Sequence, residues 1–104
     1  MKTFSQRVVE IALAIPKGRV TTYGRIARAA GGGAISAQSI TNILGKAYDE
    51  GAHGIPFHRI VYADGRIWIS EKRRKERIAL YKKERIEVDD KDRIKNFRNI
   101  LLEF

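Results

Sequence analysis

Residues 15–27 read IPKGRVTTYGRIA, and this stretch decides how the chain folds. Pro16 cannot continue a helix because it lacks a backbone N–H and its ring clashes with the preceding turn. Gly18 permits the turn that follows, and residues 19–21 form a short extended link. The hydroxyl of Thr22 can accept a hydrogen bond from a free N–H in the first turn of a helix. The stretch therefore predicts the end of one helix, a turn, and the start of a second helix.

The segment before this stretch has the pattern of an amphipathic helix. Thr3 and Gln6 have the spacing of a capping box, and apolar residues recur at intervals of three and four from Phe4 to Ile15. Residues 1–6 lack the apolar core and the small-residue cleavage site of a signal peptide. We therefore expect an intracellular protein, either cytoplasmic and nucleoid-associated or nuclear.

Two helices separated by glycines follow. The first is expected from Tyr23 to Ala30 and stops at the glycine triplet 31–33. Ser36 has the residue type of an N-cap for the second, in which apolar residues recur from Ala37 to Ala47. Two short helices around a glycine turn are typical of a helix-turn-helix that binds DNA. The same pattern also fits a flexible loop between two helices that bind nothing.

The second half of the chain predicts a small β-hairpin and two more helices. Residues 60–62 and 67–69 are strand-like and flank the turn signal Asp64-Gly65. A charged helix is expected from Glu71 to Lys83 and a final helix from Asp90 to Leu102. The predicted fold class is mainly α with a small β-hairpin wing, that is, a winged-helix-like helix-turn-helix domain.

The composition fits one folded domain with a polyanionic partner. The chain has 104 residues, 43% of them hydrophobic and 32% charged, so we expect a single domain over residues 1–104. Lys and Arg number 21 against 12 Asp and Glu, and the net charge of +9 favours nucleic acid as partner. A basic, solvated surface is the alternative, and the run Lys72–Lys75 fits either interpretation. No apolar run approaches the roughly 18 residues of a membrane span, so we expect no membrane contact.

The chain contains no cysteine. This excludes disulfides, thiolate nucleophiles and cysteine-ligated metal sites. An enzyme acting through His58 and Glu84, such as a hydrolase, is one hypothesis, but the sequence offers no second acid, nucleophile or metal cluster to accompany them. We therefore expect neither a metal nor a cofactor.

Two segments carry a resemblance to a known family. Residues 15–27 and the segment Ile55–Val61, followed by Asp64-Gly65, resemble the O6-alkylguanine-DNA alkyltransferases, and the resemblance extends from about Phe4 to Val88. In those enzymes a cysteine between proline and histidine takes the alkyl group from a flipped guanine. Here that position is Phe57.

An aromatic residue at the cysteine position resembles the pattern of the alkyltransferase-like proteins, which bind O6-alkylguanine without repairing it. Those proteins usually have tryptophan at this position, so Phe57 is a departure. Alkyl transfer needs a polarizable nucleophile activated by a neighbouring base, and a phenyl ring offers none. The sequence therefore predicts a protein that does not catalyse this reaction.

The resemblance also implies a lesion pocket. His58 and Glu84 match the histidine and buried carboxylate that activate the thiol in the enzymes, and here they are expected to orient the pocket. Taken without the resemblance, His58 fits a partly buried structural histidine and Glu84 a surface helix charge. Trp68 fits plain core as well as a pocket wall. The full set of expected pocket residues is Tyr23, Phe57, His58, Arg59, Trp68, Ser70 and Glu84.

The expected DNA contacts come from the starts of the two helices. Tyr23 matches the tyrosine that crowds the phosphate of the target nucleotide and favours its rotation, although it also fits the edge of an apolar core. Thr21 and Thr22 offer hydroxyls and amides to phosphates, and Arg25, at a position where this family often has a capping-box glutamate, is expected to face phosphate. The family inserts its second helix into the minor groove, where Ala34, Ala37 and Thr41 would allow close approach or serve simply as helix formers.

One contact of the family is missing. An arginine near the start of the second helix normally fills the gap left by the flipped base, and aligning Ile40 with the family's apolar position puts Gln38 there. An ungapped alignment would put Ile40 there instead, at the cost of the apolar register. Glutamine can hydrogen-bond the orphaned cytosine but lacks a planar cation that stacks and pairs together.

The resulting hypothesis is a monomeric, non-enzymatic sensor of O6-alkylguanine in double-stranded DNA. Minor-groove readout is degenerate, so extraction of a damaged base rather than sequence would set its specificity. By resemblance, the bound complex would flag the lesion for nucleotide excision repair proteins. The alternative is a general architectural or regulatory DNA-binding module without lesion specificity.

Overall fold

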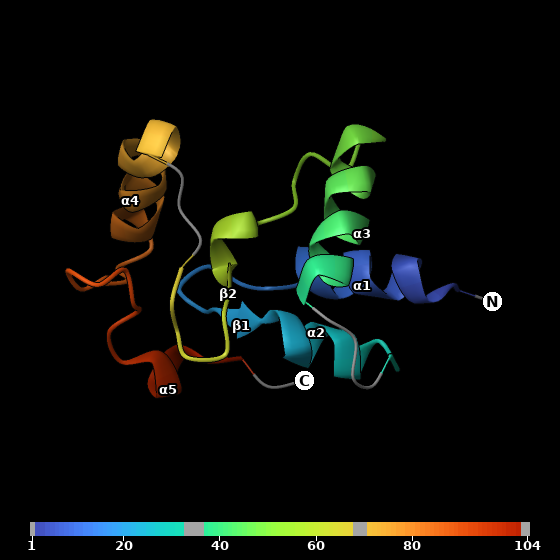
Figure 1. Ribbon diagram of the computed structural model, residues 1–104, viewed down its shortest axis with the longest axis horizontal. Helices are drawn as coiled ribbons and strands as arrows, with labels where there is room; N and C mark the ends of the chain where they lie inside the picture. Colours follow the sequence, from blue (N-terminus) through green and yellow to red (C-terminus); the bar gives the residue numbers. More distant parts are fainter. Residues whose placement is uncertain (1, 33–36, 68–70, 103–104) are drawn as a thin grey trace.

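A computed structural model describes residues 2–32, 37–67 and 71–102. Its elements divide into two groups with a small sheet between them (Figure 1). Three helices lie on one side and the charged helix with the C-terminal turn on the other. In chain order the elements are α1 (Phe4–Leu13), β1 (Thr21–Thr22), α2 (Tyr23–Ala29), α3 (Ala37–Asp49), the 3-10 turn η1 (Phe57–Arg59), β2 (Ile60–Val61), the 3-10 turn η2 (Glu71–Arg73), α4 (Arg74–Lys83) and α5 (Phe97–Ile100).

The helix starts predicted from the sequence are confirmed. The Thr3 hydroxyl accepts from the Gln6 N–H at 3.2 Å, and the Gln6 side chain accepts from the Thr3 N–H at 2.9 Å, which completes the capping box of α1. The Thr22 hydroxyl accepts from the Arg25 N–H at 3.2 Å and caps α2. The Ser36 cap lies outside the described residues.

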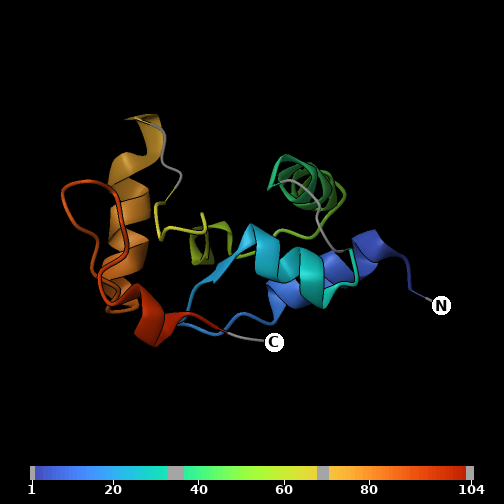
Figure 2. The same ribbon diagram turned by 60° about the horizontal axis from the view of Figure 1, so that its bottom comes forward.

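Helices α1, α2 and α3 pack against one another around the main core (Figure 2). Their apolar faces meet as the periodicity predicts, because residues three and four apart lie on one side of a helix. The fully buried members are Val8, Ala12, Ile26, Ala27, Ile40 and Leu44. In the described ranges no helix is both long and apolar enough to cross a membrane.

The predicted β-hairpin is wrong in its pairing. β2 pairs in parallel with β1, with Thr21 opposite Ile60 and Thr22 opposite Val61. The expected turn does form, since the Tyr62 N–H donates to the Arg66 carbonyl at 2.9 Å, but the Ile67 N–H donates to the Asp92 carbonyl at 2.8 Å. The rest of the second expected strand, including Trp68, lies outside the described residues. Local turn signals could not reveal a partner strand near the start of the chain.

The predicted final helix over residues 90–102 is also wrong, because only Phe97–Ile100 is helical. The Asp89 carboxylate accepts from the N–H groups of Lys91 at 2.8 Å and Arg93 at 3.0 Å, a turn geometry that competes with helix formation. Asp92 and Asn96 then adopt positive φ values of 59° and 56°. Apolar residues of this irregular segment still dock on a second core around Tyr81, namely Ile94, Phe97 and Ile100.

Gly65 is expected to tolerate no side chain. Its φ is +84°, and an added Cβ would lie 3.1 Å from the Phe97 ring. Gly65→Ala should lower the free energy of unfolding by about 2 kcal/mol, measured by urea denaturation, because it combines backbone strain with a steric clash. As a matched control, Gly45→Ala lies in α3 with nothing within 4 Å of the added methyl. It should raise stability by about 0.5–1 kcal/mol through helix propensity, and equal effects of the two changes would contradict the described geometry.

Candidate nucleic-acid interface

Glu84 holds a polar cluster together at the C-terminal end of α4. Its side chain is only 7% exposed, so it is not a surface helix charge. The carboxylate accepts hydrogen bonds from the Gly18 backbone N–H at 2.9 Å and from Arg59, whose Nε and Nη2 lie at 2.9 and 3.1 Å. It also pairs with Nε2 of His58. The chain thus brings the predicted His58, Arg59 and Glu84 together.

The protonation states of this cluster follow from burial and hydrogen bonding. Burial alone would raise the pKa of Glu84, but hydrogen bonds from Arg59, the Gly18 amide and His58 more than offset it and lower the pKa from 4.5 to about 2. Burial lowers the pKa of His58 below 6.5, and its contact with Glu84 offsets only part of that effect. At neutral pH a neutral His58 therefore donates its Nε2–H to an ionised Glu84.

The same cluster fixes three segments of backbone. Arg59 Nη1 donates to the Ile15 carbonyl at 2.9 Å, which ties η1 to the turn after α1. The Tyr81 hydroxyl donates to the His58 carbonyl at 2.5 Å, which ties η1 to α4, and burial raises the pKa of Tyr81. The position of η1, and with it the side chain of Phe57, is therefore set from both sides.

Phe57 is half-buried at the start of η1 and packs against the three-helix core. Its ring meets the edge of Tyr48 with centroids 5.9 Å apart, and Tyr48 in turn lies 4.8 Å from the ring of His53. The Tyr48 side chain is 42% exposed. Sequence reasoning missed this second aromatic wall, although a tyrosine in the last turn of an amphipathic helix was a visible signal.

Tyr23 lies next to Tyr62 because of the parallel strand register. It directly follows β1 and Tyr62 directly follows β2, so their rings lie side by side with centroids 5.7 Å apart. Tyr23 is half-buried and hydrogen-bonds the side chain of Thr41 on α3, and burial raises its pKa. The structure thus links the predicted Tyr23 and Thr41 across α2 and α3.

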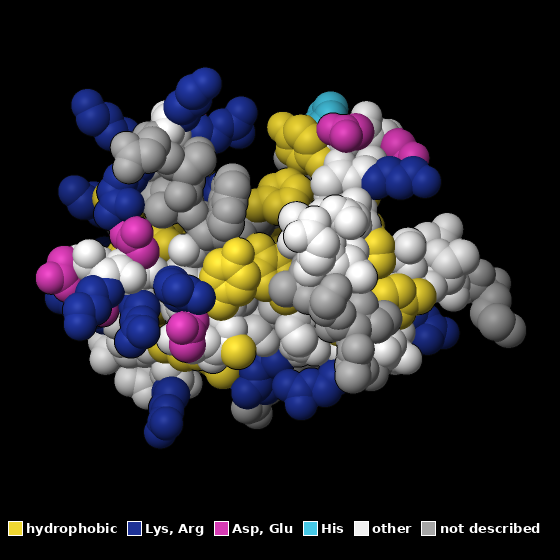
Figure 3. Space-filling view, viewed as in Figure 1, with side chains coloured by type: hydrophobic (Ala, Val, Ile, Leu, Met, Phe, Trp, Pro, Cys, Tyr) yellow, Lys and Arg dark blue, Asp and Glu magenta, His cyan; other side chains and the backbone are white. Residues whose placement is uncertain are grey.

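Arg77 is a cation of this region that sequence reasoning did not single out. It is half-buried on α4, hydrogen-bonds Tyr81, and interacts electrostatically with Tyr23 and His58. Only its position four residues before Tyr81 on one helix face could have indicated this. The hydrophobic side chains between α3 and the α4 group are visible on the face shown in Figure 3.

The residues predicted to contact phosphates differ in how far they are exposed. Thr21 is fully buried and its hydroxyl donates to the Leu102 carbonyl at 3.4 Å, which removes that hydroxyl from the surface. Thr22 is 7% exposed and Arg25 is half-buried at the start of α2. Thr22 therefore acts chiefly as a helix cap.

At the start of α3, Gln38 is exposed and its amide nitrogen donates to Asn42 at 3.1 Å. Ile40 is fully buried, which supports the alignment that gives the surface position to Gln38. Ala37 is described by its backbone only. The remaining predicted contacts, Ala34, Trp68 and Ser70, lie outside the described residues.

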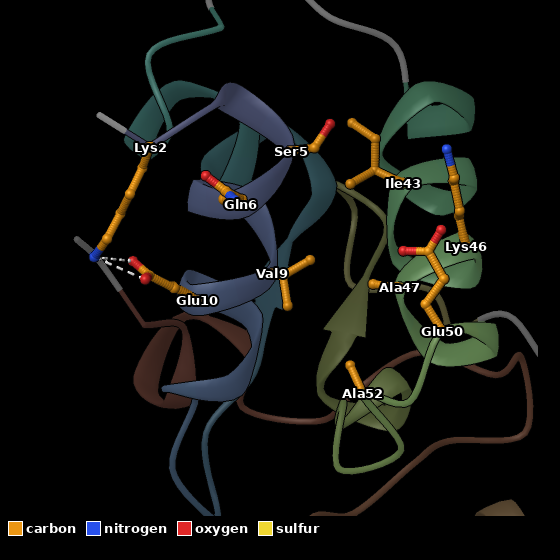
Figure 4. Close-up of a pocket in the computed structure, with 10 residues that line it drawn as sticks. All are labelled: Lys2, Ser5, Gln6, Val9, Glu10, Ile43, Lys46, Ala47, Glu50 and Ala52. Atoms are coloured by element: carbon orange, nitrogen blue, oxygen red, sulfur yellow. Dashed lines mark hydrogen bonds and ion pairs between the residues drawn. The ribbon is translucent and has the colours of Figure 1, made fainter.

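A groove of about 570 Å³ lies apart from these residues, between α1 and α3. Val9, Ile43 and Ala47 form its apolar floor, and the ion pair of Lys2 with Glu10 stands at one wall (Figure 4). None of the predicted site residues lines it. The candidate interface is therefore defined by the Glu84 cluster and by the ring pairs Phe57–Tyr48 and Tyr23–Tyr62 rather than by this groove.

The helix-turn-helix group, the parallel strand pair and the buried cluster behind Phe57 define an alkyltransferase-type DNA-binding fold. A family model described as "6-O-methylguanine DNA methyltransferase, DNA binding domain" matches residues 3–86, and the chain belongs to this family. The predicted mainly α, helix-turn-helix class is confirmed by the solved structures that share this fold.

Two of those structures match over the whole of both chains. S. pombe Atl1 in complex with damaged DNA containing O6-carboxymethylguanine has a TM-score of 0.73 at 24% identity, and S. pombe ATL in complex with DNA has 0.73 at 25%. The DNA base-flipping proteins of Escherichia coli (strain K12) and Shigella flexneri are each 43% identical over 65 residues, 62% of this chain and 48% of theirs. The chain thus spans about half the length of these curated relatives.

Removing the charge of Glu84 should destabilise the fold. Glu84→Gln leaves the buried Arg59 guanidinium without its counter-ion, so the free energy of unfolding should fall by about 3 kcal/mol in urea denaturation. The exposed Glu87→Gln removes a charge from the same segment and should change it by less than about 0.5 kcal/mol. Equal effects of the two variants would contradict the central role of Glu84.

As the pH is lowered, the first loss of stability should come from protonation of His58. Because the folded-state pKa of His58 is lowered, the unfolded chain binds more protons below pH 6.5, and stability falls as the pH drops from there. The contribution of Glu84 is lost at lower pH, between 4.5 and about 2. His58→Gln should flatten the first part of the profile, below about pH 6.5, in urea titrations, and an unchanged slope there would contradict the assignment.

Proposed function

We propose that this chain recognises O6-alkylguanine in duplex DNA by flipping the base, and that it does not transfer the alkyl group. The observation that carries this proposal is the position of Phe57. Its half-buried ring occupies the first position of η1, which Arg59 and Tyr81 hold in place from both sides. The scaffold that positions an acceptor residue is present, and the acceptor position holds an aromatic ring.

The chemistry of the cluster supports binding without transfer. The chain has no cysteine, and a phenyl ring supplies no electron pair for attack on an alkyl carbon. The Nε2–H of His58 is already committed to Glu84. Because the chain offers no thiol for the other ring nitrogen to deprotonate, His58 and Glu84 act as positioning residues for η1 rather than as a relay.

Stacking on aromatic side chains can offset the free energy that is needed to extrude a base from the duplex. Extraction of a base from the stack costs a few kcal/mol, and stacking on an aromatic ring returns roughly 1–3 kcal/mol. Phe57 and Tyr48 present such rings next to each other, and Tyr23 stands at the start of α2. A guanine whose pairing is weakened by O6-alkylation costs less to extract, which favours the damaged base.

The first turns of α3 suit the minor groove. Gln38 is exposed there and donates to Asn42 on the same helix, so its side chain is accessible to the cytosine that the flipped guanine leaves unpaired. We further propose that the monomeric protein on its lesion serves as a signal for nucleotide excision repair proteins. This part rests on the likeness to Atl1, which is solved on damaged DNA.

A second candidate function is a general DNA-binding module without lesion specificity. The observation in its favour is Gln38, because a glutamine cannot stack and pair together as an arginine does. The two candidates differ in whether Tyr23 and Phe57 matter for binding to a damaged site.

The chain should bind a duplex with one O6-methylguanine more tightly than the matched unmodified duplex. We expect a difference of about tenfold or more, which corresponds to the roughly 1–3 kcal/mol of stacking on the pocket ring. Fluorescence anisotropy measures both affinities, and mass spectrometry of the oligonucleotide after long incubation should find the methyl group retained. Equal affinities would contradict lesion recognition, and loss of the methyl group would contradict binding without transfer.

The aromatic character of Phe57 should carry this preference. Phe57→Leu keeps an apolar side chain but removes the ring, so the ratio of the two affinities should approach one, whereas Phe57→Trp should retain it. Tyr23→Phe should reduce the preference while leaving binding to the unmodified duplex unchanged. If Phe57→Leu and Tyr23→Phe both keep the full ratio, these two rings do not carry the preference, whereas a ratio near one already in the parent would favour the general DNA-binding module.

A further inference from the structure

The start of α4 carries a cluster of exposed cations that the proposed pocket does not use. Lys72 and Arg73 lie in η2 and Lys75 in the first turn of α4, and all three are exposed. Among the residues that the structure describes, none of the three has an ion pair. Arg74 differs from them because its guanidinium pairs with Asp92 at 2.7 and 3.2 Å. We call Lys72, Arg73 and Lys75 the α4 cation surface.

This surface continues the side of α4 that carries Tyr81. Residues four apart lie above one another on a helix, so Arg73, which directly precedes α4, continues the line of Arg77 and Tyr81 along it. Exposure decreases along that line: Arg73 is exposed, Arg77 is half-buried, and Tyr81 is 1% exposed beneath the carbonyl of His58. These three residues therefore connect the exposed start of α4 to the backbone of η1, next to Phe57.

The pairing of Arg74 fixes the orientation of this surface. Its bidentate contact with Asp92 attaches the first turn of α4 to the C-terminal segment. Apart from Tyr81, the residues of α4 contribute no fully buried side chain, so this contact is one of few that orient the helix. The neighbouring cations are consequently held outward, and Lys and Arg side chains surround this part of the molecule in Figure 3.

We propose that the α4 cation surface binds backbone phosphates of the DNA strand that carries the extruded nucleotide. This inference rests on the proposed function, because the strand is brought past α4 only when its base enters the pocket beside Phe57. Phosphates fit these residues because Lys and Arg bind them without reading sequence. The long axis of the molecule is 42 Å. At 3.4 Å per base pair, the whole molecule is as long as about 12 base pairs of duplex, so α3 and α4 together span fewer than that.

The salt dependence of binding tests this proposal. A triple variant with Lys72→Gln, Arg73→Gln and Lys75→Gln removes the three cations, and a control with Lys82→Gln, Lys83→Gln and Lys91→Gln removes three exposed cations beyond the surface. Affinities of the parent and both variants are measured from low to moderate salt on an O6-methylguanine duplex and on its unmodified counterpart. Circular dichroism and urea denaturation verify that both variants fold.

On the lesion duplex, the slope of log affinity against log salt should fall by about 2 to 3 in the triple variant and by less than about 1 in the control. Shortening the duplex to about 5 base pairs on one side of the lesion should reduce the parent's slope similarly, and shortening the other side should not. Equal slopes in the two variants, or a triple variant with the parent's slope, would overturn the proposal. Equal parental affinity for the two duplexes would instead overturn the proposed function, so the two failures are distinguishable.

Discussion

The carboxylate of Glu84 is the interaction on which the arrangement of this molecule depends. It accepts from the Gly18 amide in the turn after α1, from Arg59 in η1, and from His58 beside it, while belonging to the end of α4. One buried charge therefore connects the helix-turn-helix group to the C-terminal group. A buried carboxylate is costly to desolvate, so it persists only when its partners satisfy it as fully as they do here.

This constraint also explains how η1 is held in a fixed position beside the three-helix core. The turn at η1 is held by the hydroxyl of Tyr81 and the guanidinium of Arg59, and neither contact needs a thiol. Neither contact involves the side chain of Phe57. The parallel pairing of β1 with β2 sets Tyr23 beside Tyr62, with ring centroids 5.7 Å apart.

The sequence predicts those features that depend on local chemistry. The caps at Thr3 and Thr22 follow from residue type and spacing, and the three-helix core follows from apolar periodicity. The prediction of a final helix over residues 90–102 is wrong because the Asp89 carboxylate binds the backbone N–H groups that such a helix would need. The apolar periodicity of the residues after Asp89 gave no sign of this competing turn. The strand partner of β2 is β1, which lies far earlier in the chain, and no short-range pattern encodes such a pairing.

The candidate site shows the same division. The sequence predicts four residues of the site, because a continuous motif and one distant carboxylate carry the resemblance: Phe57, His58, Arg59 and Glu84. It does not predict Tyr48 and Arg77, which join the site only through tertiary packing. A crystal structure of the protein on an O6-methylguanine duplex most directly tests whether the chain holds a flipped damaged base beside Phe57.

The expected result is an extrahelical guanine in contact with the Phe57 ring, with its methyl group retained. A guanine stacked within the duplex would contradict it.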